Sequence, residues 1–170
     1  MTDVPHLETE RLLLRGWRAD DVEDFARIHA DAETMRFIGD GHTHTREEAW
    51  RTLAQLCGHW VLRGYGLWAA EEKASGSLIG RIGLYRPDGW PGLEIGWLLD
   101  RSRWGEGLAT EGARTALDWA FDHLDADQVI SLINRGNDAS VAVAERLGAT
   151  YRHDVDVGGI EAMLYAVDRP

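Results

Sequence analysis

Apolar residues recur along the chain at two spacings, one typical of helices and one of strands. Between residues 19 and 30 they recur every three or four positions, with acids near the start. This is the period of an amphipathic helix, and acids suit the positive end of its dipole. The predicted inner face consists of Val22, Phe25, Ile28 and His29. A second helix is expected after Thr45, which has capping-box spacing to Glu48, up to about Arg63, where Gly64 stops it.

Short apolar runs separated by turn residues predict the strands. The first lies within residues 7–17, and three successive antiparallel strands are expected within 67–70, 78–85 and 93–99. The remaining elements are an alanine-rich helix over 109–124, a β-branched strand over 128–133, a helix over 141–147 closed by Gly148, and two strands over 149–155 and 161–167 joined by Gly158 and Gly159. This order predicts one α+β domain spanning residues 1–170, with a mixed sheet.

Composition and charge narrow the class of protein. With 170 residues, of which 44% are hydrophobic, the chain has enough apolar material for one core. Its net charge of −11 has the wrong sign for neutralising nucleic-acid phosphates and favours a cationic partner. The single cysteine, Cys57, cannot form an internal disulfide or a thiolate metal site. We expect it to be a small buried residue of the second helix.

Neither a secretory signal nor a membrane-spanning segment is expected. The chain starts Met1-Thr2-Asp3, with an acid where a signal peptide carries basic residues. Charges interrupt every apolar stretch well before about 20 residues, the length needed to cross a bilayer. The expected location is the cytoplasm, without a membrane partner.

The segment most informative about chemistry joins a strand to a helix over residues 99–111. Glycines such as Gly105 and Gly107 expose backbone N–H groups beside the positive end of the helix, and this combination binds phosphate. A tight turn without a ligand has the same composition. Two common phosphate loops are excluded, because a P-loop needs a lysine that this turn lacks and the dinucleotide motif needs Gly or Ala where Thr110 stands.

Residues 104–111, Trp-Gly-Glu-Gly-Leu-Ala-Thr-Glu, resemble the loop that cradles the coenzyme A pyrophosphate in the Gcn5-related N-acetyltransferases (GNAT), in the form found in the RimJ/RimL branch. The similarity extends over nearly the whole chain, through that branch's first strand (9–15), its fourth strand (94–99) and its coenzyme-binding strand and helix (134–149). The resemblance implies the GNAT fold, with a central mixed, mostly antiparallel sheet flanked by helices. It also implies an N-acetyltransferase that uses acetyl-CoA as co-substrate, without a metal.

By the same resemblance, Glu94 is the carboxylate that deprotonates the acceptor amine, and we expect burial and neighbouring groups to raise its pKa toward the working range. An outward-facing strand glutamate is the alternative. Many relatives place the tyrosine that protonates the departing thiolate where this chain has Ala144. Ser140, one helical turn beyond Asn137, is therefore the candidate acid, and Tyr165 is a second candidate.

The resemblance also implies contacts to coenzyme A. The backbone of Trp97, Leu98 and Leu99 corresponds to the strand segment that pairs with the pantetheine amides. The phosphate loop comprises Trp104, Gly105, Glu106, Gly107, Leu108, Ala109 and Thr110. Asn134 and Asn137 lie where relatives hydrogen-bond the pantetheine arm, and Asn137 equally suits a helix N-cap. The cations nearest to these segments in the sequence, which could face the phosphates, are Arg101, Arg103 and Arg135.

The predicted reaction is direct transfer of acetyl to a primary amine, without an acyl-enzyme. The acidic charge favours a basic protein N-terminus, a polyamine or another small cationic amine, and the sequence does not choose among them. The alternative is a non-catalytic acyl-CoA-binding module of the same fold, which Ala144 keeps open. His42 and His44 lack a dependable third metal ligand. Their loop is expected at the acceptor mouth.

A homodimer is expected as the assembled state. Eight tryptophans exceed what a core of this size needs. Trp90 lies in a Gly/Pro-rich turn where we expect it to be exposed and available for an interface. Members of the RimJ/RimL branch often pair, which adds an argument by resemblance.

Overall fold

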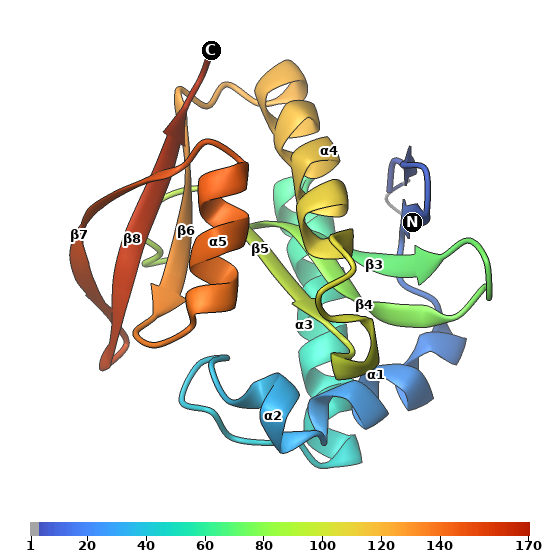
Figure 1. The fold of residues 1–170 in the computed structure, drawn as a ribbon. Coiled ribbons are helices and arrows are strands. Elements are labelled where there is room, and N and C mark those ends of the chain that lie inside the picture. Colours follow the sequence, from blue (N-terminus) through green and yellow to red (C-terminus); the bar gives the residue numbers. More distant parts are fainter. Residues whose placement is uncertain (1–3) are drawn as a thin grey trace.

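The computed structural model describes residues 4–170, and residues 1–3, used above against a secretory signal, lie outside the described part. Within it, one sheet has the strand order β1-β2-β3-β4-β5-β6-β8-β7 (Figure 1). The strands are β1 (Leu7–Glu8), β2 (Leu12–Arg15), β3 (Leu67–Glu72), β4 (Leu78–Tyr85), β5 (Glu94–Leu99), β6 (Gln128–Asn134), β7 (Thr150–Val157) and β8 (Ile160–Asp168). The helices are α1 (Val22–His29), α2 (Ala32–Met35), α3 (Arg46–Arg63), α4 (Leu108–His123) and α5 (Asp138–Arg146). All neighbouring strands run antiparallel except β5 and β6, which confirms the predicted mixed, mostly antiparallel sheet.

Strands β5 and β6 pair over only a short stretch. Their register joins Glu94 to Ile130, and the Ile130 N–H donates to the Leu93 carbonyl at 2.8 Å. Beyond Glu94 the two strands diverge (Figure 1), while β6 keeps its pairing with β8 from Gln128 to Asn134. The divergence leaves one edge of β5 open.

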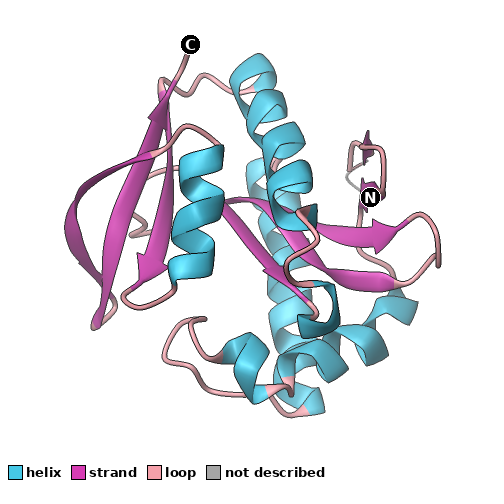
Figure 2. Ribbon diagram, in the orientation of Figure 1, coloured by secondary structure: helices cyan, strands magenta, loops and turns pink. Residues whose placement is uncertain are grey.

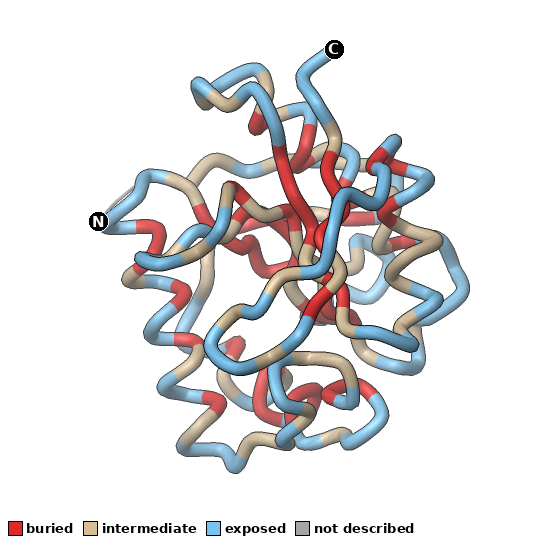
Figure 3. Tube along the Cα trace, turned by 90° about the vertical axis from the view of Figure 1, so that its left-hand side faces the viewer, coloured by how far each residue is buried: buried red, intermediate tan, exposed pale blue. Residues whose placement is uncertain are grey.

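Helices cover both faces of the sheet (Figure 2). On one face α4 packs so closely on β4 that a Cβ at Gly112 would lie 2.5 Å from the Ile82 side chain. On the other face α1 and α3 contribute to an apolar cluster of Phe25, Ala26, Ala49, Leu53, Leu56, Leu67, Ala69 and Leu78. Buried residues are concentrated toward the middle of the molecule (Figure 3), and six of the eight residues of β4 are buried. Successive side chains of a strand point to opposite faces of the sheet. Along β4 and along β5, side chains therefore point alternately toward α4 and toward the face covered by α1 and α3.

Helix α3 begins and ends where its capping residues predict. Thr45 accepts from the Glu48 N–H and Glu48 accepts from the Thr45 N–H, the reciprocal bonds of a capping box. At the other end Gly64 has φ 75°, a conformation that favours glycine.

No helix within residues 4–170 is both long enough and apolar enough to cross a bilayer.

Two short elements differ from the sequence-based expectation. The N-terminal segment forms two strands, β1 and β2, because the chain reverses at residues 9–11 and the Thr9 hydroxyl accepts from the Leu12 N–H. The turn of helix α2 was not predicted. It forms because Asp31 caps it through the Thr34 N–H at 2.9 Å, and four residues are too few to show a helical period.

A buried ion cluster joins β2 to the start of α1. Arg15, which is only 3% exposed, donates to both carboxylate oxygens of Asp21 at 2.7 and 2.9 Å and to Glu71 at 2.6 Å. The second Asp21 oxygen also accepts from the Arg18 N–H at 2.7 Å. Removing one partner of such a cluster leaves a buried charge poorly compensated.

Asp21→Ala is therefore expected to lower the free energy of unfolding by about 3 kcal/mol, the usual loss when a buried pair loses one partner. Urea denaturation measures the change. Asp20→Ala is the matched control, because Asp20 is the adjacent acid but is exposed, and it should change stability by about 0.5 kcal/mol or less. Equal losses in the two variants would contradict a stabilising role for the cluster.

Candidate active site

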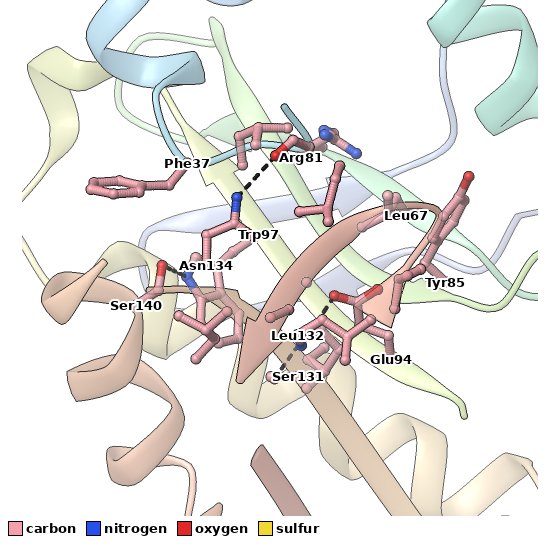
Figure 4. Close-up of a pocket in the computed structure, with 18 of the residues that line it drawn as sticks. Phe37, Leu67, Arg81, Tyr85, Glu94, Trp97, Ser131, Leu132, Asn134 and Ser140 are labelled. Atoms are coloured by element: carbon pink, nitrogen blue, oxygen red, sulfur yellow. Dashed lines mark hydrogen bonds between the residues drawn. The ribbon is translucent and has the colours of Figure 1, made fainter. Parts of the chain in front are cut away.

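A cavity of about 310 Å³ lies where β5 and β6 diverge, on the sheet face covered by α1 to α3. Gly96 forms part of its wall, and a Cβ at this position would meet no atom within 4 Å. Figure 4 shows Glu94 and Tyr85 at one end of the cavity and Ser140 and Asn134 at the other. The other polar or aromatic lining residues are Phe37, Thr52, Gln55, Arg81, Trp90, Trp97, Ser131 and Asn137. The structure thus brings the two predicted catalytic residues, Glu94 and Ser140, to one cavity.

The Glu94 carboxylate is held from two directions. The Trp90 indole N–H donates to one oxygen at 2.7 Å, and the Leu132 N–H donates to the other at 3.4 Å. Burial raises the pKa of Glu94 to about 7, although the Trp90 and Leu132 hydrogen bonds and the positive charge of Arg81 act in the opposite direction. A carboxylate with this pKa can take up and release a proton near neutral pH.

Trp90 contacts the candidate base, a position that sequence reasoning missed. We expected it to be exposed, and this expectation is wrong: its ring is partly buried, packs edge-on against Tyr85 at 5.5 Å and reaches Glu94 through its N–H. The i to i+4 spacing from Trp90 to Glu94 was visible, but it lies across a turn and a strand start, where spacing does not determine contact.

Ser140 lies at the first turn of α5, at the opposite end of the cavity from Glu94. Its hydroxyl oxygen accepts from the Trp97 indole N–H at 3.3 Å, so the hydroxyl proton stays available for donation. Ala144 is fully buried in an apolar cluster that includes Ile133 and Tyr165. Tyr165 belongs to this apolar cluster and does not line the cavity, so the structure gives the second candidate acid no access to a substrate there.

The two asparagines border the same end of the cavity and each also has a structural role. Asn137 caps α5, since its side chain accepts from the Ser140 N–H at 3.2 Å. Asn134 donates to the Gly39 carbonyl at 2.9 Å and so joins the end of β6 to the loop after α2. Capping and cavity lining therefore coexist at Asn137.

The open edge of β5 presents backbone groups of alternate residues. The Asp100 N–H donates to the Ile79 carbonyl in β4 at 2.7 Å. Because antiparallel pairing alternates, the backbone of Leu98 also faces β4, whereas that of Trp97 and Leu99 faces the open edge. Of the three predicted backbone contacts to pantetheine, the geometry supports Trp97 but not Leu98. Leu99 offers only its N–H, because its carbonyl accepts from the Trp104 indole N–H at 2.9 Å.

The turn from β5 into α4 presents a run of unpaired backbone N–H groups. Gly105 and Gly107 have φ of 78° and 81°, which glycine adopts without strain. Among the described residues, the N–H groups of residues 105–110 have no acceptor, and the next one, of Glu111, bonds to the Gly107 carbonyl at 3.0 Å. Such a nest at a helix N-terminus fits a diphosphate. The amides of Leu108, Ala109 and Thr110 belong to it although the Leu108 side chain is core.

Arg11 and Glu111 hold this loop in place, a role that sequence reasoning did not assign. Arg11 donates to the Glu106 carbonyl at 2.9 Å and pairs with Glu111 at 2.7 Å. Glu111 also accepts from the Thr9 hydroxyl at 2.5 Å. These bonds tie the loop to the β1–β2 turn, so it is fixed without a ligand.

The three arginines expected near the phosphates are all engaged by carboxylates. Arg101, Arg103 and Arg135 pair with Asp31, Glu72 and Asp154 respectively. An anion at this loop would therefore be held by backbone groups more than by free side-chain cations.

Other predicted residues lie elsewhere than expected. The loop after α2 borders the cavity through Phe37, Ile38 and Gly39, and not through His42 or His44. Residues 4–170 contain no cluster of side chains suited to a metal ion.

Cys57 is exposed and not buried, because it lies on the outer face of α3. The amphipathic pattern of α3 is weakened by apolar residues on both faces, so the sequence does not show on which face Cys57 lies.

Comparison with known proteins agrees with this geometry. The family model described as an acetyltransferase (GNAT) domain matches residues 11–150. An uncharacterized Bacillus subtilis protein, YkkB, is 39% identical over 150 residues, 85% of each chain. An acetyltransferase structure from Agrobacterium tumefaciens superimposes with a TM-score of 0.86 at 29% identity, covering 98% of this chain and 96% of that one.

The RimL ribosomal-protein acetyltransferase, whose structure is a complex with coenzyme A, superimposes with a TM-score of 0.80. It is 17% identical and covers 96% of this chain and 98% of its own, so its likeness concerns the fold alone. The GNAT family model, in contrast, spans most of the chain, including Glu94 and the amide nest. The chain belongs to the GNAT acetyltransferase family.

Proposed function

We propose that the protein transfers acetyl from acetyl-CoA directly to a primary amine in the cavity between β5 and β6. The observation that carries the proposal is the placement of two features on one strand: β5 starts at Glu94, inside the cavity, and leads after Leu99 to the amide nest of residues 105–110. Acetyl-CoA, when bound, supplies the thioester carbonyl and the leaving thiolate. The open edge of β5 between these two features would receive its pantetheine arm.

Each proposed proton transfer has a residue at the matching end of the cavity. Glu94, in its ionised form, takes the proton of the acceptor ammonium, directly or through a water, and so frees the lone pair that attacks the acetyl carbon. A carbon–nitrogen bond forms, the nitrogen loses its second proton to solvent, and the carbon–sulfur bond breaks. Ser140 donates its hydroxyl proton toward the departing sulfur and is reprotonated from solvent. The Trp97 N–H on the open edge stabilises negative charge on the carbonyl oxygen.

The alternative is a non-catalytic acyl-CoA-binding module, because Ala144 cannot supply the tyrosine acid of many relatives. Both functions predict binding of acetyl-CoA, measured by calorimetry, and only the first predicts turnover. Mass spectrometry of a panel of primary amines, including basic peptides with free N-termini and polyamines, after incubation with acetyl-CoA separates them. Binding without any acetylated amine would favour the binding module.

We also propose that the chain forms a homodimer. The outer face of α3 exposes Trp50, Ala54, Cys57 and Val61 at helical spacing, and such an apolar stripe is typical of helix packing. This replaces Trp90 as the residue-level argument. Sedimentation velocity at micromolar concentration should give a dimer, and Trp50→Glu should give a monomer. A wild-type monomer with and without coenzyme A would contradict the proposal.

A further inference from the structure

One charged side chain of the cavity has no part in the mechanism above. Arg81 lies in β4, opposite Leu98 of β5, and lines the cavity together with Glu94 and Tyr85. Its Nε is buried, and among the described residues it has no hydrogen-bond partner. A buried guanidinium normally pairs with a carboxylate, as Arg15 does with Asp21.

The groups around Arg81 leave its positive charge largely uncompensated. His29 and His44 lie near it but carry no negative charge, and burial lowers the pKa of His29 to about 3, which keeps that ring neutral. Glu94 and Tyr85 are the groups that favour the charged form of Arg81. Neither makes an ion pair or hydrogen bond with it, and burial lowers the pKa of Arg81. A buried guanidinium without a charged partner lowers the free energy of unfolding, unless a bound ligand supplies the missing negative charge.

The position of Arg81 relative to Glu94 sets the kind of ligand. Arg81 and Tyr85 are four residues apart in β4, and Tyr85 is directly opposite Glu94 in β5. At about 3.3 Å per residue, the Cα atoms of Arg81 and Glu94 are separated by about 13 Å along the strands. Gly96 lies in β5 between Glu94 and the residue opposite Arg81, and because it has no side chain, the part of the cavity between Glu94 and Arg81 stays open. Two long side chains that line one cavity from these positions leave room between them for a compact molecule.

We propose that Arg81 binds an anionic group of the acceptor, so that the substrate is an amine that also carries a carboxylate or phosphate a few carbon atoms away. The inference rests on the proposed acetyl transfer, in which Glu94 receives the amine at the other end of the same space. A guanidinium forms two parallel hydrogen bonds with a carboxylate or phosphate, which fixes orientation as well as supplying binding energy. Polyamines, expected from net charge alone, lack the group that Arg81 would pair with.

Matched acceptors test the proposal. Aminocarboxylic acids of increasing chain length are compared with their own carboxamides, which keep the shape but lose the charge, and with aminoalkylphosphonates to separate carboxylate from phosphate recognition. The wild type should prefer the anionic member of a pair by about tenfold or more in kcat/KM. Arg81→Met should remove this preference mainly through KM, while affinity for acetyl-CoA stays within about twofold. Because the preference compares two acceptors on the same enzyme, it does not depend on the change that losing the Arg81 charge makes to the pKa of Glu94. Arg86→Met, at an exposed arginine just beyond β4, is the control and should keep the preference.

Each outcome bears on the proposal separately from the acetyl transfer itself. Equal turnover of acids and carboxamides by the wild type overturns the role of Arg81 but leaves the acetyltransferase intact. If no amine is acetylated, the proposed function fails, and calorimetry with the acids alone still decides the inference: binding that Arg81→Met abolishes supports it, and absence of binding overturns it. If Arg81→Met does not fold, Arg81→Lys replaces it. A preference for acids in the wild type that is weaker in Arg81→Lys supports the proposal, and an equal preference in both enzymes overturns it.

Discussion

Glu94→Gln is expected to lower kcat by about 100- to 10,000-fold, the usual loss when a general base is removed. Glutamine keeps the size of the side chain and can still accept from the Trp90 N–H. Affinity for acetyl-CoA should therefore remain nearly unchanged in calorimetry. Glu145→Gln, at an exposed glutamate of α5, is the control and should keep full activity. If the Glu94→Gln enzyme keeps most of its activity, Glu94 is not the general base.

The same residue predicts the pH profile. Only the ionised carboxylate accepts a proton, and the pKa of Glu94 is raised to about 7, so kcat/KM should fall as pH decreases through about 7. The Trp90 hydrogen bond acts to lower this pKa. Trp90→Phe should therefore raise the apparent pKa and move the acidic limb to higher pH. If the acidic limb of the pH profile does not move in Trp90→Phe, the limb reports the ionisation of a group other than Glu94.

Replacing Gly105 and Gly107 together by valine should lower affinity for coenzyme A by about a hundredfold or more. Both glycines have positive φ, where a β-branched residue costs about 1–3 kcal/mol, so the loop leaves the conformation that aligns its N–H groups. A Cβ at Gly105 would meet no atom within 4 Å, and one at Gly107 would lie 3.7 Å from Arg11, so the fold should survive. Calorimetry measures the affinity and circular dichroism confirms folding.

Gly76→Val is the matched control for the loop variant. Gly76 lies in the turn between β3 and β4, has φ 70° and is open, so it carries the same kind of backbone cost, at one position where the loop variant carries it at two, far from the loop. Its affinity for coenzyme A should equal that of the wild type. An unchanged affinity in the folded Gly105 and Gly107 double variant would place the diphosphate elsewhere.

Much of the fold was predictable because local signals and tertiary packing agree. The capping box at Thr45 and the positive φ at Gly64 are encoded by residue types at fixed spacing, and α3 has those bounds. The loop from Trp104 to Thr110 was recognisable for the same reason. Its chemistry depends on backbone groups whose conformation the glycines determine.

What could not be predicted depends on contacts between distant segments. Arg11 reaches the phosphate loop across 95 residues of sequence to Glu106, and no local pattern indicates that contact. Arg81 reads as an ordinary polar residue of an apolar strand, and only the divergence of β5 and β6 makes it line a cavity. Trp90 was misplaced because a Gly/Pro-rich turn is usually exposed, whereas here the turn folds back over Glu94.

The account is tested most directly by following an isotopically labelled acetyl group from acetyl-CoA by mass spectrometry of both the small molecules and the intact protein. It predicts that the label appears on the nitrogen of a primary amine when wild-type enzyme, acetyl-CoA and amine are together, at a rate that Glu94→Gln strongly reduces. It also predicts that no label resides on the protein when the amine is omitted. A labelled protein without amine, or bound acetyl-CoA with no labelled amine across the panel, would contradict direct transfer at this site.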